Sequence, residues 1–98
     1  MQIKGVTKTE RIEIDNILKP YKNKYKFYCY GSRAKGNFRP LSDLDIMIKG
    51  VEKADINDIE NLKTLFDNSN LSYVVNLADF YNLSDTFYNL IEKDLIEL

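Results

Sequence analysis

The sequence predicts an α/β (α+β) fold in which a small mixed β-sheet is covered by helices. Short runs rich in β-branched and aromatic residues alternate with longer segments whose apolar residues recur at helical spacing. Helices that lie between strands are typical of this architecture. A chain of 98 residues has room for one modest core. We therefore expect a single domain that spans residues 1–98.

The first expected element is a helix within residues 6–25, where apolar side chains recur at helical spacing. Thr7, with Glu10 three residues later, fits a capping box, although Thr9 competes as the cap. Pro20 is expected to kink or end this helix, because its ring interrupts the hydrogen-bond ladder.

The middle of the chain is expected to alternate between strands and turns. An aromatic run at residues 24–31 predicts a strand that stops at Gly31. Residues 32–36 suit one or two helical turns, and residues 37–42 predict a loop. The alternating pattern of residues 43–50 predicts a second strand.

The rest of the chain predicts two helices and two strands. A helix is expected at 54–70 with Asp55 as its cap, followed by a strand at 71–80. A shorter helix at 83–94 begins at a Ser-Asp cap, and residues 95–98 suit an edge strand. We expect these helices to cover one face of the sheet. The apolar stripes of the two helices comprise Ile56, Ile59, Leu62, Leu65 and Phe66, and then Phe87, Leu90 and Ile91.

Composition narrows the classes of function. The net charge is −1 and the isoelectric point about 5.4, so non-specific nucleic-acid binding is not expected. The lone cysteine, Cys29, lies in an apolar run and is expected to be a small buried hydrophobe in a reducing compartment. No segment has the pattern of a signal peptide or a membrane span, so a cytoplasmic protein is expected.

Two aspartates on the second predicted strand are the first candidate functional residues. Asp43 and Asp45 lie two positions apart, so their side chains point to the same face, about 6.5–7 Å apart at Cα. Carboxylates at this spacing can bridge divalent cations, as in two-metal phosphoryl transfer. Mg²⁺ suits such a site, because it needs only oxygen ligands and substrate phosphates. The alternative is a solvated polar face on an edge strand.

The turn that precedes these aspartates strengthens the metal hypothesis. Gly31 permits a close backbone approach, and Ser32 begins a short helix whose free N–H groups favour phosphate. Arg33 and Lys35 are candidates for charge-assisted contacts to a triphosphate. The alternatives are a simple connector between strand and helix, and two surface cations.

These residues carry a family resemblance. "GSRAKG" followed by "SDLD" resembles the signature of the minimal nucleotidyltransferases of the DNA polymerase β-like superfamily. That signature is Gly-Ser, ten residues, then Asp-x-Asp, and Gly31, Ser32, Asp43 and Asp45 match it without a gap. "YVVNLADF" and "LIEKDLIEL" resemble the family's third strand and its closing helix and tail. The resemblance implies the polymerase β-like nucleotidyltransferase fold over nearly the whole chain.

One position departs from the family pattern. Relatives usually have Val-Asp-Leu in the third strand, where the aspartate is the third carboxylate of the site, whereas this chain has Asn76. An amide can ligate Mg²⁺ through its carbonyl oxygen, but it supplies no charge and accepts no proton. Asp79 lies three residues further on and has the wrong strand parity to replace it. The departure puts turnover in doubt, whereas nucleotide binding is still expected.

The resemblance also implies a partner. The chain is too short to contain an acceptor-binding domain, and minimal nucleotidyltransferases are commonly antitoxins of HEPN ribonuclease toxins. It therefore implies Mg²⁺-dependent transfer of AMP from ATP to a hydroxyl of a HEPN-type protein. A second hypothesis is a catalytically degenerate module that neutralises its partner by binding. A third is an unrelated α/β domain with an accidental motif. The oligomeric state is left open, a homo-oligomer included.

Overall fold

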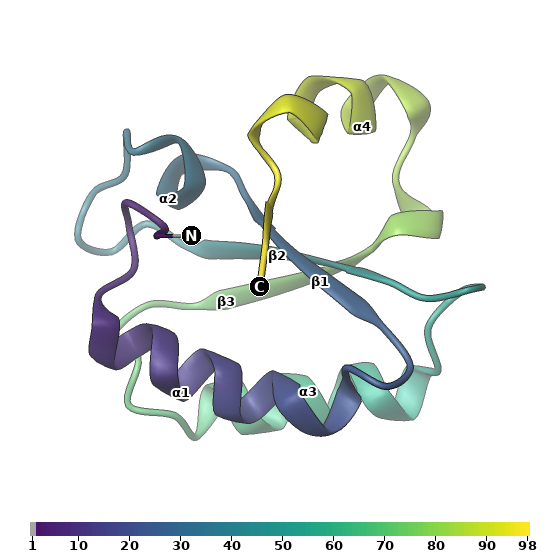
Figure 1. Ribbon diagram of the computed structural model, residues 1–98, viewed down its shortest axis with the longest axis horizontal. Helices are drawn as coiled ribbons and strands as arrows, with labels where there is room; N and C mark the ends of the chain where they lie inside the picture. The colour runs from purple at the N-terminus through teal and green to yellow at the C-terminus, as the bar shows by residue number, and fades with distance from the viewer. Residues whose placement is uncertain (1) are drawn as a thin grey trace.

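The computed structural model describes residues 2–98, which form a four-stranded mixed sheet with helices on both of its faces (Figure 1). The α-helices are α1 (Lys8–Leu18), α2 (Ser32–Lys35), α3 (Ile56–Asp67) and α4 (Asp85–Ile91). The strands are β1 (Lys26–Tyr30), β2 (Leu44–Lys49), β3 (Val75–Asp79) and β4 (Ile96–Glu97). Three short 3₁₀ helices complete this part of the chain, at Lys19–Tyr21, Phe80–Asn82 and Glu92–Asp94. No helix within residues 2–98 is long and apolar enough to cross a membrane.

The strands lie in the order β3-β2-β1-β4. β1 pairs antiparallel with both β2 and β4, whereas β2 and β3 are parallel and are joined through α3. The expected mixed sheet and the edge strand at the end of the chain are confirmed. Because β1 and β2 run in opposite directions, the end of β1 lies beside the start of β2. The start of β3 lies at the same edge of the sheet.

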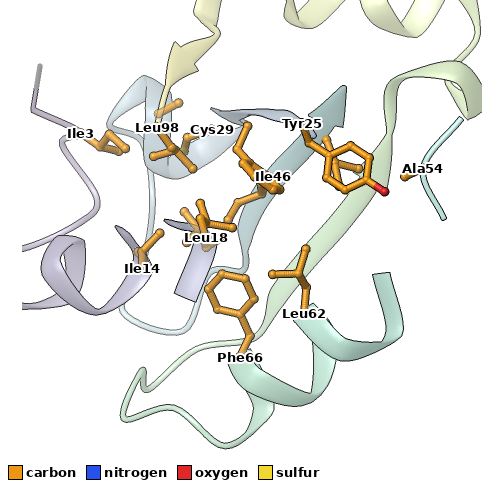
Figure 2. Close-up of a cluster of buried hydrophobic side chains, with 14 of the residues drawn as sticks. Ile3, Ile14, Leu18, Tyr25, Cys29, Ile46, Ala54, Leu62, Phe66 and Leu98 are labelled. Carbon is orange, nitrogen blue, oxygen red and sulfur yellow. The ribbon is translucent and has the colours of Figure 1, made fainter. Parts of the chain in front are cut away.

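One face of the sheet carries the main hydrophobic core. α1 and α3 lie side by side under this face (Figure 1) and bury side chains against the strands, as Figure 2 shows. Ile14, Leu18, Ile46 and Leu62 have no exposed surface, and the same holds for Cys29. Burial raises the pKa of the Cys29 thiol to about 12, so it behaves as the expected small hydrophobe.

The opposite face is only partly covered, and this corrects the expectation that helices lie on one face. α4 packs above the sheet (Figure 1), where Ile91 joins Tyr30 and Met47 in a second, smaller cluster. The alternation of β2 explains this arrangement, because Met47 points away from Ile46 and Ile48 and is still 1% exposed. An apolar residue on the second face thus requires a second cover.

The helix starts follow the expected capping chemistry. Thr7 caps α1, and the Thr7 side chain and backbone exchange hydrogen bonds with Glu10, so the capping box is confirmed and Thr9 lies inside the helix. Asp55 caps α3, and Ser84 caps α4. Each cap satisfies a backbone N–H that the helix itself leaves free.

The expected buried stripes are only partly correct. On α3, Leu62 and Phe66 are buried, but Ile56 and Leu65 are exposed, because the short helix turns only a narrow face toward the sheet. On α4 only Ile91 is buried, and Phe87 and Leu90 are exposed.

Candidate active site

The candidate site lies at the edge where β1 ends and where β2 and β3 begin. Gly31 follows β1, Asp43 immediately precedes β2, and Asp45 lies inside β2. In the sheet register, Asp45 is opposite Tyr30 on one side and Asn76 on the other. The fold therefore brings together residues that are up to 45 positions apart in the chain. Asp43 was expected within the strand and instead lies just before its first residue.

Asn76 connects the two aspartates directly. Its Nδ2 donates a hydrogen bond to Asp43 Oδ2 at 2.9 Å and a second to Asp45 Oδ1 at 3.2 Å. The amide thus places its two N–H donors between two carboxylates, where a positive group is electrostatically favoured. This contact separates the two negative charges from one another without supplying a positive charge.

Gly31 brings the turn against the second aspartate. Its φ of 77° lies in the region that side chains rarely adopt, and a Cβ at this position would collide with Asp45 Oδ2. Only a glycine lets the backbone turn this close to the carboxylate. The predicted phosphate-binding turn and the predicted metal-binding pair therefore share one surface.

Asp45 is half-buried, and its environment changes its acidity. Burial raises the pKa of its carboxyl group above the ordinary value of 3.8, and the charge of Asp43 adds to the increase. The hydrogen bond from Asn76 acts in the opposite direction, because it favours the charged carboxylate. A positive group at this site would therefore stabilise the charged form of Asp45.

The oxygen donors of this site fit Mg²⁺. Two carboxylates converge on one point at the surface, and a third side chain there, Asn76, has a carbonyl oxygen as well as its amide donors. Mg²⁺ is commonly held by one or two carboxylates while substrate phosphates and waters complete its shell. Within residues 2–98 there is no group of three acidic, histidine or cysteine side chains that could hold a metal ion. The donor set therefore suits an ion that is bound together with a phosphate ligand.

The short helix after Gly31 contributes backbone donors. α2 begins at Ser32 and is closed by Gly36, whose φ of 97° ends the helix and whose N–H bonds Ser32 O at 2.8 Å. Lys35 follows in the same turn, with a 47% exposed side chain and its ammonium 3.9 Å from an Asp94 carboxylate oxygen. A surface cation held this loosely is free to turn toward a phosphate.

Arg33 lies elsewhere, in contrast to its expected contact with a triphosphate. It is only 3% exposed, and its guanidinium donates to backbone carbonyl oxygens of the surrounding loops. Because these carbonyls occupy its donors, we assign Arg33 to the framework that supports the site. The sequence pattern placed Arg33 in the correct turn but does not encode the direction of its side chain.

Tyr30 borders the site and Phe87 packs against Tyr30, and neither was predicted as a site residue from the sequence. Tyr30, opposite Asp45 in the sheet, is buried, and its ring meets that of Phe87 at a centroid distance of 6.1 Å. Phe87 keeps 39% of its surface exposed. The sequence did not indicate that Phe87 is exposed, because an aromatic residue on a helical stripe normally indicates core packing.

Asp79 is confirmed as a residue outside the site. It is 3% exposed and accepts hydrogen bonds from Ala54 N at 2.7 Å and Tyr81 N at 2.9 Å. Its side chain lies with the α1 and α3 face of the sheet, as its strand parity indicated. It therefore caps a turn and does not replace the missing carboxylate.

Comparisons with known proteins agree with this geometry. Residues 12–97 match the family model described as Polymerase beta, Nucleotidyltransferase. The chain is 34% identical over 87 residues to the "Probable protein adenylyltransferase MntA" of Haemophilus influenzae. That alignment covers 88% of this chain and 76% of the relative.

Solved structures share the fold. A crystal structure of a toxin–antitoxin with AMP-PNP aligns with a TM-score of 0.68 at 23% identity, over 88% of this chain and 69% of that one. A mutant of the toxin–antitoxin MntA-HpeT gives a TM-score of 0.70 at 22% identity, over 90% and 70%. A protein from Shewanella oneidensis gives 0.66 at 20% identity, over 94% and 71%. At these identities the likeness concerns the fold.

Proposed function

The chain belongs to the polymerase beta nucleotidyltransferase family, and from this premise we propose that it transfers AMP from ATP to a hydroxyl group of a partner protein. The observation that carries the proposal is the meeting of Gly31, Asp43 and Asp45 at one edge of the sheet. The relative named a probable protein adenylyltransferase supports AMP as the transferred group and a protein as the acceptor.

In this proposal the residues of the site have separate roles. Asp43 and Asp45 would hold Mg²⁺, which when bound supplies charge neutralisation and polarises the phosphates. The backbone at Gly31 and Ser32 binds the triphosphate, and Lys35 adds a positive charge from the same turn. The turn thereby holds the α-phosphorus near the aspartates, where an acceptor can approach from solvent.

The reaction itself is a substitution at the α-phosphorus. The acceptor oxygen forms a bond to this atom, the bond to the bridging α–β oxygen breaks, and pyrophosphate leaves. The hydroxyl proton passes to a base, and Asn76 cannot accept it. Of the three side chains that meet here, only Asp43 and Asp45 can take the proton.

The partner follows from the same relatives. We propose that the acceptor is a HEPN-type protein and that the chain acts as its antitoxin, with residues 1–98 working as one domain. Solved structures with this fold include toxin–antitoxin complexes, which supports a protein partner. Phe87, whose ring packs against that of Tyr30, and Lys35, in the short helix after Gly31, both keep exposed surface that a partner could contact.

One observation favours a second candidate function. Asn76 lies where the family resemblance implies a carboxylate, and its amide already donates a hydrogen bond to each of the two aspartates. A protein with this arrangement could bind a nucleotide and neutralise its partner by occlusion alone. This candidate predicts a stable complex in which the partner gains no mass.

A two-step experiment tests these proposals. Calorimetric titration of ATP with Mg²⁺ should show metal-dependent binding to the wild-type protein and none to Asp43→Asn/Asp45→Asn. Incubation with ATP, Mg²⁺ and the HEPN-type protein of the same source, followed by intact-mass measurement, should show added AMP. Inhibition of the partner without added mass would establish the second candidate. Absence of binding to the wild-type protein would overturn both.

A further inference from the structure

We propose that Arg33 is a positioning residue that fixes Asp43, the first aspartate of the site. The effect of Arg33 on catalysis rests on the proposed function, whereas its effect on the position of Asp43 rests on contacts within the chain. Sequence alone suggested a triphosphate contact for Arg33. The structure instead places its guanidinium against the loop that precedes Asp43, to which it donates hydrogen bonds.

The two aspartates are held in different ways. Asp45 lies within β2 and has a strand neighbour on each side, Tyr30 and Asn76. Asp43 lies before the first residue of β2, so no ladder of the sheet includes it. A residue that ligates a cation must be held in position, and the Asn76 hydrogen bond holds only the Asp43 side chain, so the Asp43 backbone needs support from another source.

That support comes from the two peptide groups that flank Asp43. The preceding carbonyl, Ser42 O, accepts a hydrogen bond from Arg33 Nε at 2.9 Å. The following N–H, that of Leu44, donates to Val74 O at 2.9 Å. Val74, which immediately precedes β3, therefore fixes one side of Asp43, and Arg33 fixes the other.

The rest of the guanidinium ties the same loop to the N-terminal segment. Nη1 donates to Gly5 O at 2.7 Å, and Nη2 donates to Pro40 O at 2.9 Å and more weakly to Arg39 O at 3.4 Å. Two segments, the loop of residues 39–42 and the N-terminal segment at Gly5, thus meet at one planar group. Only the fork of an arginine can reach them together, because a lysine offers a single nitrogen.

The position of the guanidinium is further restricted by rings. Its central carbon lies 3.6 Å from the centroid of the Tyr73 ring and 5.2 Å from that of Phe38. Gly5 is equally constrained, because a Cβ there would lie 2.6 Å from the Cβ of Arg33. Close packing on both sides leaves the guanidinium one orientation.

The charge of Arg33 argues for a role beyond stability. Among residues 2–98, the acceptors that bond this buried guanidinium are backbone carbonyls, and none is a carboxylate. Burying a cation without an anionic partner is costly, and an apolar residue could fill the space at lower cost. What the arginine supplies in return is a fixed loop on the N-terminal side of Asp43.

The test uses Arg33→Lys with a control that loses stability elsewhere. Leu62→Ala removes a buried side chain from the opposite face of the sheet and leaves the loop intact. Both variants should melt at lower temperature than the wild-type protein. Only Arg33→Lys should lose affinity for ATP with Mg²⁺, by about tenfold or more, and need a higher Mg²⁺ concentration for half-saturation. Equal affinities in the two variants would overturn the proposal.

A second measurement needs no ligand and separates this inference from the proposed function. In the nucleotide-free protein, Arg33→Lys should speed hydrogen exchange of the Leu44 amide and shift the Asp43 amide resonance. The Ile46 amide, inside β2, should not change. Unchanged Asp43 and Leu44 signals would overturn the proposal even if ATP binding is absent from the wild-type protein.

A milder variant covers the case in which Arg33→Lys does not fold. Tyr73→Leu removes the ring under the guanidinium and keeps the arginine, whereas Tyr73→Phe keeps the ring. Tyr73→Leu should show the same selective changes at Asp43 and Leu44, to a smaller degree, and Tyr73→Phe should not. Identical amide signals in the two Tyr73 variants would contradict the proposed role of Arg33.

Discussion

The two faces of the sheet differ in what they contain. The face toward α1 and α3 is closed by apolar side chains, many of which have no exposed surface. The face toward α4 has a cluster of only three buried residues, and beside it the carboxylates of Asp43 and Asp45 reach the surface. The densely packed core and the candidate site thus lie on opposite faces of the same sheet.

Mutations on the two faces should therefore affect different properties of the protein. Stability depends on apolar area removed from water, which is concentrated on the α1 and α3 face. A cation and a phosphate need accessible oxygens and N–H groups, which the half-covered face supplies. β2 contributes to both stability and ligand binding, because its alternate residues point to opposite faces of the sheet. Truncation of the buried apolar side chains should therefore act mainly on stability, and neutralisation of a site carboxylate should act mainly on ligand binding.

The largest expected effect is on the chemical step. Asp45→Asn should reduce adenylyl transfer by about a thousandfold or more, since it removes charge worth several kcal/mol in such sites. Thermal unfolding of the same variant should occur at or above the wild-type temperature, because burial disfavours the charged carboxylate of Asp45. A large drop in melting temperature would break the proposed separation of the two faces.

A core truncation should give the opposite result. Leu62→Ala is expected to lower the free energy of unfolding by about 2–5 kcal/mol, because Leu62 is fully buried under the sheet. Urea unfolding would measure this loss. The Kd of the folded variant for ATP with Mg²⁺ should equal that of the wild-type protein. A changed Kd would show that the faces are coupled.

Placing a third carboxylate at position 76, as the family resemblance implies, should strengthen ion binding and weaken the metal-free fold. Asn76→Asp is expected to tighten Mg²⁺ binding in the presence of ATP by about tenfold, because a third negative charge lies beside the ion. It should also destabilise the metal-free protein, since the amide bonds to Asp43 and Asp45 are replaced by repulsion. Calorimetry and thermal unfolding would measure the two effects, with Asn76→Ala as the control that removes the amide without adding charge.

Removing the helix cap at Thr7, which lies on the α1 and α3 face, should have a smaller effect on stability. Thr7→Ala removes the side chain that accepts a hydrogen bond from Glu10 N and should cost about 1 kcal/mol of stability. Chemical denaturation would detect this loss. Thr9→Ala is the matched control, because Thr9 lies inside the first turn of the same helix and does not cap it.

The smallest expected effect is on pH dependence. The pKa of Asp45 is raised above 3.8, so the native state binds this proton more tightly than the unfolded chain does. Between the ordinary and the raised pKa, the contribution of Asp45 to stability therefore falls as pH rises, whereas cation binding strengthens. Titration of the Asp45 carboxyl carbon by NMR should show a midpoint above 3.8. Asn76→Ala should raise it further, because it removes the hydrogen bond that lowers this pKa.

The order of the elements and the caps were accessible from the sequence, because they depend on local patterns. Thr7, Asp55 and Ser84 sit where the capping signals place them. Which face a helix covers depends on long-range packing, so the position of α4 above Met47 was not predicted.

The same limit applies to the site. The spacing of Gly31, Asp43 and Asp45 indicated that they would meet, since strand periodicity and a glycine turn determine it. The direction of the Arg33 side chain did not follow from its place in the motif, because it depends on Gly5, which lies 28 residues away in the chain. The exposed position of Phe87 likewise depends on how α4 settles over the sheet.

The two hydrogen bonds of Asn76 affect the arrangement of the site when no metal ion is bound. Two close carboxylates normally need a counter-ion to remain together, but here an amide already lies between them. Removing divalent ions with a chelator should therefore leave the edge of the sheet assembled, and the fold should not depend on the metal. A divalent ion that binds here would meet an assembled site and would need to displace only the Asn76 amide.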